Sequence, residues 1–218
     1  MTERREFECP FRLAGRRVWV AGHGGMVGRT LVRRLQREGC EILTAERNAV
    51  DFRRQGETEA WIEANRPDAI FLAAAKVGGI LANDTRPAEF LYDNLLIQAN
   101  VIDAAWRSGV KKLLALGSSC IYPKEAPQPI SERALLTGPL EPTNKAYAIA
   151  KIAGLMLCES YRRQYGADFV AAMPTNLYGP GDNFDLETSH VVPALLRKID
   201  DAKRRGDTSV TIWASRVS

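Results

Sequence analysis

Residues 17–28 read RVWVAGHGGMVG, a short apolar run that leads into a cluster of glycines. The apolar run predicts a strand over 17–22, and apolar residues at helical spacing predict a helix over 25–38. Glycines in the turn between them let it close tightly and let the backbone approach a pyrophosphate, which then meets the free N–H groups of the helix. These glycines are Gly22, Gly25 and Gly28. The stretch therefore predicts a dinucleotide-binding strand–turn–helix.

The alternation of strand and helix patterns continues beyond this turn. Further strands are expected at 41–45, 69–75, 112–117 and 168–173, and further helices at 57–65, 89–108 and 144–165. A proline-rich loop is expected over 123–143. Five alternations predict a parallel sheet with right-handed crossovers and helices on both faces, which is a doubly wound, Rossmann-type α/β fold.

The alternation of strands and helices does not extend to either end of the chain. Residues 1–15 read as a polar, mobile leader, and 16–185 as the dinucleotide-binding domain. Residues 186–218 read as the start of an incomplete C-terminal lobe, with a helix over 191–205 and a strand over 210–213.

Composition excludes several classes of protein. The chain has 218 residues, 45% of them hydrophobic, and its net charge of +4 is scattered, which favours solvated helix faces over a nucleic-acid patch. A mild positive balance still suits an anionic ligand. Four cysteines without metal spacing and only two histidines argue against a zinc site and for a reducing cytoplasm. No signal peptide or membrane-spanning apolar run is expected.

Tyr147 and Lys151 lie four residues apart on an expected helix, so their side chains share one face. A tyrosine has an ordinary pKa of about 10, and a neighbouring ammonium together with an oxidised nicotinamide would lower it. Tyr147 is therefore a candidate general acid toward a carbonyl oxygen. Ser118 follows the fourth expected strand, at the edge where open parallel sheets bind ligands, and is a second partner for that oxygen.

Cys120 and His190 are candidates for a further acid–base step. Most free cysteines are small buried hydrophobes, but Cys120 comes two residues after Ser118, where a thiol can take a proton from a carbon beside a ketone. A lone histidine is more often structural, yet His190 falls where the chain leaves the nucleotide domain and can supply the opposite proton.

The preferred dinucleotide is left open by the residues themselves. The second expected strand is followed by Glu46 and Arg47. An acid there would hold a ribose hydroxyl and favour NAD, whereas an arginine would pair with a 2′-phosphate and favour NADP.

Several blocks, taken together, resemble the extended short-chain dehydrogenase/reductase family. They are residues 22–28 (GHGGMVG), 72–80 (LAAAKVGGI), 116–124 (LGSSCIYPK), 140–144 (LEPTN), 147–154 (YAIAKIAG) and 173–180 (MPTNLYGP). The resemblance covers about residues 17–213, and it is closest to members that epimerise and reduce nucleotide sugars.

The resemblance implies NADPH-dependent 3,5-epimerisation and 4-reduction of GDP-4-keto-6-deoxy-mannose to GDP-L-fucose, in a homodimer with no membrane or nucleic-acid partner. Ser118, Tyr147 and Lys151 would form the reductase triad, and Cys120 with His190 would invert C3 and C5. Cofactor contacts would come from Gly22, Gly25, Met26, Val27, Gly28, Arg47, Leu116, Ser118, Lys151, Pro174, Asn176, Leu177 and His190. Lys198 and Trp213 would contact the GDP-sugar.

Two departures from the family pattern stand out. Gly24 replaces an arginine found in many relatives, and the sequence stops at Ser218, before the segment that closes over the sugar nucleotide. We therefore expect a retained cofactor site with weak GDP-sugar binding and slow or absent turnover. The alternatives are a non-catalytic NADP-binding remnant or interaction subunit, and another nucleotide-sugar epimerase or dehydratase; the latter has no need of a thiol at Cys120.

Overall fold

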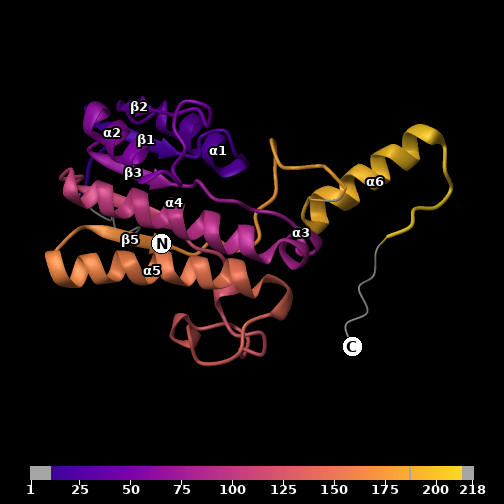
Figure 1. Ribbon diagram of the computed structural model, residues 1–218. Coiled ribbons are helices and arrows are strands. Elements are labelled where there is room, and N and C mark those ends of the chain that lie inside the picture. Colours follow the sequence, from indigo (N-terminus) through magenta and orange to yellow (C-terminus); the bar gives the residue numbers. More distant parts are fainter. Residues whose placement is uncertain (1–10, 187, 213–218) are drawn as a thin grey trace, which may run out of the picture.

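A computed structural model describes residues 11–186 and 188–212, and Figure 1 shows their arrangement. One five-stranded sheet forms the centre, in the order β2-β1-β3-β4-β5 with every neighbouring pair parallel. The strands are β1 (Arg17–Ala21), β2 (Glu41–Leu43), β3 (Ala69–Leu72), β4 (Lys112–Leu116) and β5 (Phe169–Ala172). All five expected strands are therefore confirmed, each a little shorter than the apolar run that predicted it.

The helices lie between the strands and cover both faces of the sheet. They are α1 (Met26–Leu35), α2 (Gln55–Asn65), α3 (Ile80–Thr85), α4 (Pro87–Arg107), α5 (Lys145–Tyr165) and α6 (Val191–Arg205), with short 3₁₀ helices η1 (Ser119–Ile121), η2 (Glu132–Ala134) and η3 (Pro142–Asn144). The predicted doubly wound fold is thus confirmed. None of the helices described here is long and apolar enough to cross a membrane.

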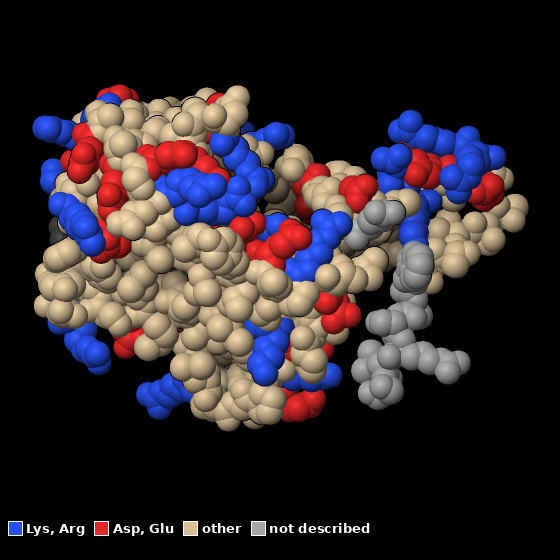
Figure 2. All heavy atoms as spheres, in the orientation of Figure 1, with Lys and Arg blue, Asp and Glu red and all other residues tan. Residues whose placement is uncertain are grey.

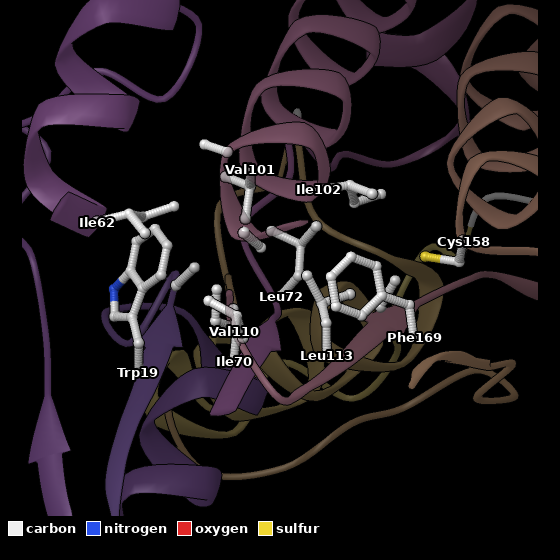
Figure 3. Close-up of a cluster of buried hydrophobic side chains, with 14 of the residues drawn as sticks. Trp19, Ile62, Ile70, Leu72, Val101, Ile102, Val110, Leu113, Cys158 and Phe169 are labelled. Carbon is white, nitrogen blue, oxygen red and sulfur yellow. The ribbon is translucent and has the colours of Figure 1, made fainter. Parts of the chain in front are cut away.

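The larger part of the core lies between the sheet and the layer of α2, α4 and α5. Figure 3 shows Trp19 of β1 and Phe169 of β5 at opposite ends of this cluster, with Val101 of α4 between them. Trp19 packs edge-on against Phe52, with ring centroids 5.2 Å apart. Burial of these side chains is the main favourable contribution to folding.

The opposite face is covered by α1 and by residues that precede the sheet. Val18, Val20 and Leu35 form the buried centre, and Phe11 and Leu13 pack against it. Gly15 also donates its backbone N–H to the carbonyl of Gly39, at 2.8 Å. Two apolar residues of the expected leader, Phe11 and Leu13, are therefore packed on the core. The leader's boundary and its mobility stay predictions.

One helix was missed by the sequence. Helix α3 has six residues, too few for a helical period to stand out, and it follows two glycines. Asn83 stabilises it by donating to the carbonyls of Gly78 and Gly79, at 2.7 and 3.0 Å. The loop after β3 is therefore shorter and more ordered than the pattern predicted.

The strand expected over 210–213 is wrong for residues 210–212, and Trp213 lies outside the described residues. Ile212 is exposed, and no described strand pairs with this segment, so the β-branched run lacks the neighbour that a strand needs. Helix α6, by contrast, has the predicted bounds. It projects away from the sheet in Figure 1, and on the face shown in Figure 2 its basic and acidic side chains are interspersed.

Ion pairs hold the edge of the sheet where the strands begin. Asp68 accepts hydrogen bonds from the backbone N–H of Arg17 at 3.0 Å and from Lys111 Nζ at 2.8 Å. Lys112, the first residue of β4, pairs with Asp168, which precedes β5, at 2.6 Å. The candidate site residues follow the opposite, carboxyl ends of the strands. The ion pairs and the candidate site therefore lie at opposite edges of the sheet.

Candidate active site

The glycine turn between β1 and α1 is closed by backbone contacts that leave no room for side chains. A Cβ on Gly28 would lie 2.1 Å from the carbonyl oxygen of Gly22. Gly22 has φ of +89°, and a Cβ there would lie 2.5 Å from the backbone nitrogen of Ala74. The turn therefore rests directly on the segment after β3. Gly25 caps α1 without a side-chain bond, which leaves the first N–H groups of α1 available to an anion.

Ser118 and Cys120 lie just beyond β4, where the chain turns into η1. Ser118 keeps extended backbone, with φ of −156°, and so continues the direction of the strand. The Cys120 thiol donates to Ser118 Oγ at 3.3 Å. The hydroxyl and the sulfur thus share one small region at the carboxyl edge of the sheet, as the sequence predicted.

Tyr147 and Lys151 approach this region from α5. Lys151 is 3% exposed, and its Nζ donates to the carbonyl of Leu116 at 2.9 Å. The same nitrogen lies 5.8 Å from the centre of the Tyr147 ring. The spacing of four residues therefore places the phenol and the amine on one helix face, directed at the end of β4.

The protein's own groups raise the pKa of the Tyr147 phenol. Burial raises the pKa well above its usual range, Cys120 raises it further, and Ser118 opposes the rise only in part, because the cost of burying a phenolate outweighs the neighbouring groups. The predicted lowering by an ammonium together with an oxidised nicotinamide stays a prediction. Tyr147 is consequently a neutral O–H donor at physiological pH.

Burial also shifts the other two titratable groups. It lowers the pKa of Lys151 to about 8, and the charge of a Cys120 thiolate works against that shift. It raises the pKa of Cys120, while the Ser118 hydrogen bond and the Lys151 ammonium oppose the rise. The amine therefore titrates much closer to neutral pH than an exposed lysine, and thiolate and ammonium favour each other.

This group of side chains is suited to proton transfer beside a carbonyl. A neutral phenol and a serine hydroxyl provide two donors for one oxygen, and a thiol two residues along the chain provides a separate acid–base group. An amine close to its pKa can hold or release a proton near the phenol. The four residues Ser118, Cys120, Tyr147 and Lys151 are together called the edge cluster below.

The segment after β5 completes the same edge. Gly117 donates its backbone N–H to the carbonyl of Ala172 at 2.8 Å, which ties the ends of β4 and β5 together. Pro174 is partly buried just beyond this bond, and Asn176 and Leu177 follow as exposed residues. These three residues keep their predicted assignment to the cofactor as a prediction, at a position consistent with it.

His190 lies at the end of the segment that precedes α6, and this segment contacts the loop after β3. The backbone N–H of Gly79 donates to the carbonyl of Thr188 at 2.9 Å, and a Cβ on Gly79 would lie 2.4 Å from the carbonyl oxygen of Ser189. The segment before α6 is therefore packed on the loop after β3. His190 itself is exposed at the start of α6, and no described hydrogen bond or ion pair joins it to the edge cluster.

The predicted substrate residues lie further out. Lys198 is on α6, where its Nζ donates to the carbonyl of Thr211 at 3.4 Å. It lines an open hollow of about 430 Å³ with, among others, Arg205 and Val210. Trp213 belongs to the residues outside the described part of the chain, so its predicted role is untested.

Sequence reasoning missed a residue that positions the loop after β3. Asn94 of α4 is 1% exposed; its Oδ1 accepts from the backbone N–H of Lys76 at 2.9 Å, and its Nδ2 donates to the carbonyl of Lys76 at 2.9 Å. A buried amide that satisfies both backbone groups of one residue fixes that residue in place. The signal was available as an unexplained polar residue within the apolar stripe of the helix.

These features define a Rossmann-type, dinucleotide-binding protein. They are the glycine turn, the parallel sheet, and Tyr147 with the buried Lys151 at the carboxyl edge of the sheet. Comparison with known proteins gives the family. The chain belongs to the NAD dependent epimerase/dehydratase family, whose model matches residues 18–216.

Individual relatives and solved structures agree with this assignment. The chain is 61% identical over 205 residues to GDP-L-fucose synthase of Sinorhizobium fredii (strain NBRC 101917 / NGR234), which covers 94% of this chain and 65% of that protein. It is 51% identical to GDP-L-fucose synthase of Escherichia coli (strain K12), covering 93% of this chain and 64% of that protein. A GDP-L-fucose synthetase from Naegleria fowleri bound to NADP superposes with a TM-score of 0.80 at 29% identity, covering 92% and 66% of the two chains. The chain thus spans slightly less than two thirds of these curated relatives.

Proposed function

We propose that this chain carries the cofactor-binding and acid–base part of a GDP-L-fucose synthase. The reaction is the NADPH-dependent 3,5-epimerisation and 4-reduction of GDP-4-keto-6-deoxy-mannose to GDP-L-fucose. The observation that carries the proposal is the convergence of the edge cluster, in which the Cys120 thiol donates to the hydroxyl of Ser118 and Lys151 Nζ lies 5.8 Å from the centre of the Tyr147 ring. A plain 4-epimerase has no need of a thiol at this position.

The proposed cofactor is NADP(H), and the glycine turn fits it. The backbone cradle that a Cβ would fill, at Gly22 and Gly28, permits the close approach of a pyrophosphate. Arg47 would meet the 2′-phosphate, and Met26 and Val27 would lie at the helix N-terminus beside the phosphates. Bound NADPH would supply the hydride for C4 of the sugar.

Epimerisation comes first in the proposed order. The 4-keto group acidifies the hydrogens on C3 and C5, so a base can remove a proton while the electron pair moves to O4 as an enolate. Ser118 and Tyr147 stabilise that oxyanion by donating to it. Cys120 and His190 would serve opposite faces: one takes the proton and the other returns one. Proton exchange with water then resets both groups, and the same transfer is repeated at the second carbon.

Reduction then depends on the same donors. As hydride reaches C4, the carbonyl π electrons move to O4, and Tyr147 transfers its phenolic proton to that oxygen. The raised pKa keeps the phenol protonated until this step. The Lys151 ammonium, 5.8 Å from the ring, offsets the charge of the phenolate that remains. General acid catalysis of this kind contributes about 10²–10⁴-fold to the rate.

The domain assignment remains a proposal as well. Residues 16–185 would form the NADP-binding domain, and 186–218 the beginning of the substrate lobe, where Lys198 and Trp213 would meet the nucleotide sugar. The open hollow beside Lys198 supports that placement, since a basic side chain there can face a diphosphate.

The test is a product assay with purified chain, NADPH and GDP-4-keto-6-deoxy-mannose. NADPH binding with slow formation of GDP-L-fucose is the expected result, with one NADPH oxidised per product and deuterium from heavy water at C3 and C5. Reduction without deuterium uptake would contradict the epimerase half of the proposal. Failure to bind NADPH in a direct titration would contradict the whole of it.

We also propose a cytoplasmic homodimer whose interface is formed by α4 and α5. The outer faces of these helices expose Tyr92, Ile149 and Met156, three large apolar side chains on adjacent elements. Light scattering after size exclusion should give twice the 24.1 kDa chain mass, and Ile149→Glu should give the monomer. The thiols of Cys40, Cys120 and Cys158 are free, in keeping with a reducing compartment.

A further inference from the structure

Within the described residues, a single side-chain hydrogen bond joins the glycine turn to the segment after β2, and it links His23 to Glu46. His23 directly follows Gly22, and Glu46 comes three residues after the end of β2. His23 Nε2 lies 3.1 Å from Glu46 Oε1. Because a carboxylate can only accept, the proton of this bond resides on Nε2.

The two partners differ in how firmly they are held. The side chain of His23 is 19% exposed, whereas that of Glu46 is 76% exposed. Among the described residues, His23 Nδ1 is buried without a hydrogen-bond partner. The imidazole is thus largely enclosed by the protein, whereas the carboxylate lies mostly in solvent. The hydrogen bond to His23 therefore restricts the position of the Glu46 carboxylate.

The position of Glu46 creates a conflict over the cofactor. An acid at this place accepts from the ribose 2′-hydroxyl of NAD and repels the 2′-phosphate of NADP. Arg47, the next residue, is exposed and forms no ion pair with another described residue, so its guanidinium is open to a phosphate. Two neighbouring residues thus favour different dinucleotides: Glu46 favours NAD, and Arg47 favours NADP.

We propose that His23 resolves this conflict and is a specificity-determining residue for NADPH over NADH. Its Nε2–H holds the Glu46 carboxylate at the turn and offsets part of its charge, so that Arg47 meets the 2′-phosphate without a competing acid beside it. The inference rests on the proposed function for its dinucleotide site. It adds a residue of the turn that acts through Glu46, without needing to touch the phosphate itself.

Calorimetric titration with NADPH and NADH tests the inference without relying on turnover. His23→Leu keeps much of the ring's bulk and removes the donor, whereas His23→Gln keeps an N–H at a comparable reach. We expect His23→Leu to lower the ratio of the NADH to the NADPH dissociation constant by about threefold, the size of an exposed charge contact. His23→Gln should stay within about twofold of the wild type.

A double-mutant cycle shows whether Glu46 is the intermediary. In the Glu46→Gln background, His23→Leu should leave the ratio unchanged. Glu38→Gln is the matched control: it removes a carboxylate that pairs with Arg34 beyond the far end of α1, and it should leave both dissociation constants as they are.

The outcomes separate the two proposals. An unchanged ratio in His23→Leu, or an equal loss of NADPH affinity with and without the Glu46 carboxylate, would overturn the specificity role while leaving the cofactor site intact. A His23→Gln variant that behaves like His23→Leu would do the same. Failure of the wild type to bind either dinucleotide would overturn the proposed function, and the inference with it.

Discussion

At the scale of single residues, the chemistry depends on burial more than on neighbouring charge. Tyr147 and Lys151 have pKa values shifted in opposite directions by the same cause, because burial penalises a phenolate and an ammonium alike. Burial moves each group toward its neutral form, but with a pKa of about 8 Lys151 is still mostly an ammonium at pH 7.

The role of the Tyr147 phenol can be separated from that of the thiol. Tyr147→Phe should lower the reduction rate by about 10²–10⁴-fold because the proton for O4 is lost. Deuterium exchange at C3 should be slower but stay measurable, because Ser118 still donates to the enolate oxygen. NADPH oxidation and mass spectrometry of the recovered sugar measure the two steps. Tyr165→Phe, on the same helix but stacked on Trp106, should change neither rate. Full reduction in Tyr147→Phe would refute the assignment.

Lys151 should lower the free energy of unfolding at neutral pH. Its pKa falls from 10.5 unfolded to about 8 folded, so between those values the unfolded chain binds more protons and stability rises with pH. Lys151→Met should therefore stabilise the protein by about 1–2 kcal/mol at pH 7, after allowing for the carbonyl of Leu116 that loses its donor. Urea unfolding from pH 7 to 10 measures this: the advantage should shrink as pH rises. An advantage that is constant across this range would contradict the argument.

At the scale of elements, the pair α4 and α5 is built around one tight contact. A Cβ on Gly154 would lie 2.2 Å from Gln98 Oε1. The Gln98 amide is buried and donates to the carbonyls of Ala150 and Asn94, both at 2.9 Å. The glycine thus lets α5 approach α4 closely enough for a side-chain amide to bridge the two helices.

Gly154→Ala should therefore destabilise the protein by about 1–3 kcal/mol, because the Gln98 amide must move and leave buried carbonyls without a donor. Gly56→Ala on α2, where nothing lies within 4 Å of the new methyl group, should be neutral or slightly stabilising. Denaturant midpoints of both variants give the comparison. Equal midpoints would show that the contact relaxes without cost.

Elements with a clear pattern were predictable, and those that depend on remote partners were not. The glycine turn, the five strands and the pairing of Tyr147 with Lys151 follow from local spacing. Helix α3 did not, because six residues carry too little periodicity. The packing of Phe11 did not either, because it depends on a core built from remote strands and a helix. The failed strand at 210–212 shows the converse: a β-branched run needs a neighbour that local sequence cannot supply.

At the scale of the whole molecule, a line of charges joins loops that are distant in sequence. Arg53 pairs with Asp51 at 2.7 Å and with Asp93 at 3.2 Å, and Asp93 also meets Lys76 at 3.2 Å. Lys76 pairs in turn with Glu89. The loop before α2 and the loop after β3 are thus both anchored to α4.

This network predicts how the protein responds to acid. The Arg53 guanidinium lowers the pKa of Asp51 from 3.8 to about 2, so the stability it contributes is present above pH 4 and is lost as pH falls toward 2. Asp51→Asn should lower the free energy of unfolding at pH 6 by less than about 1 kcal/mol, since the pair is partly exposed. Thermal melts should converge with the wild type near pH 2. A difference that persists there would place the effect outside this ion pair.

The separation of ion pairs and chemistry onto opposite edges of the sheet has a practical side. The turns at Gly109 and Gly166 lead into β4 and β5 on the ion-paired edge, and nothing lies within 4 Å of where their side chains would be. An affinity tag inserted at either turn would attach the molecule to a surface through the ion-paired edge of the sheet. Immobilised in that way, it would present its reactive rim to the passing solution in a single orientation.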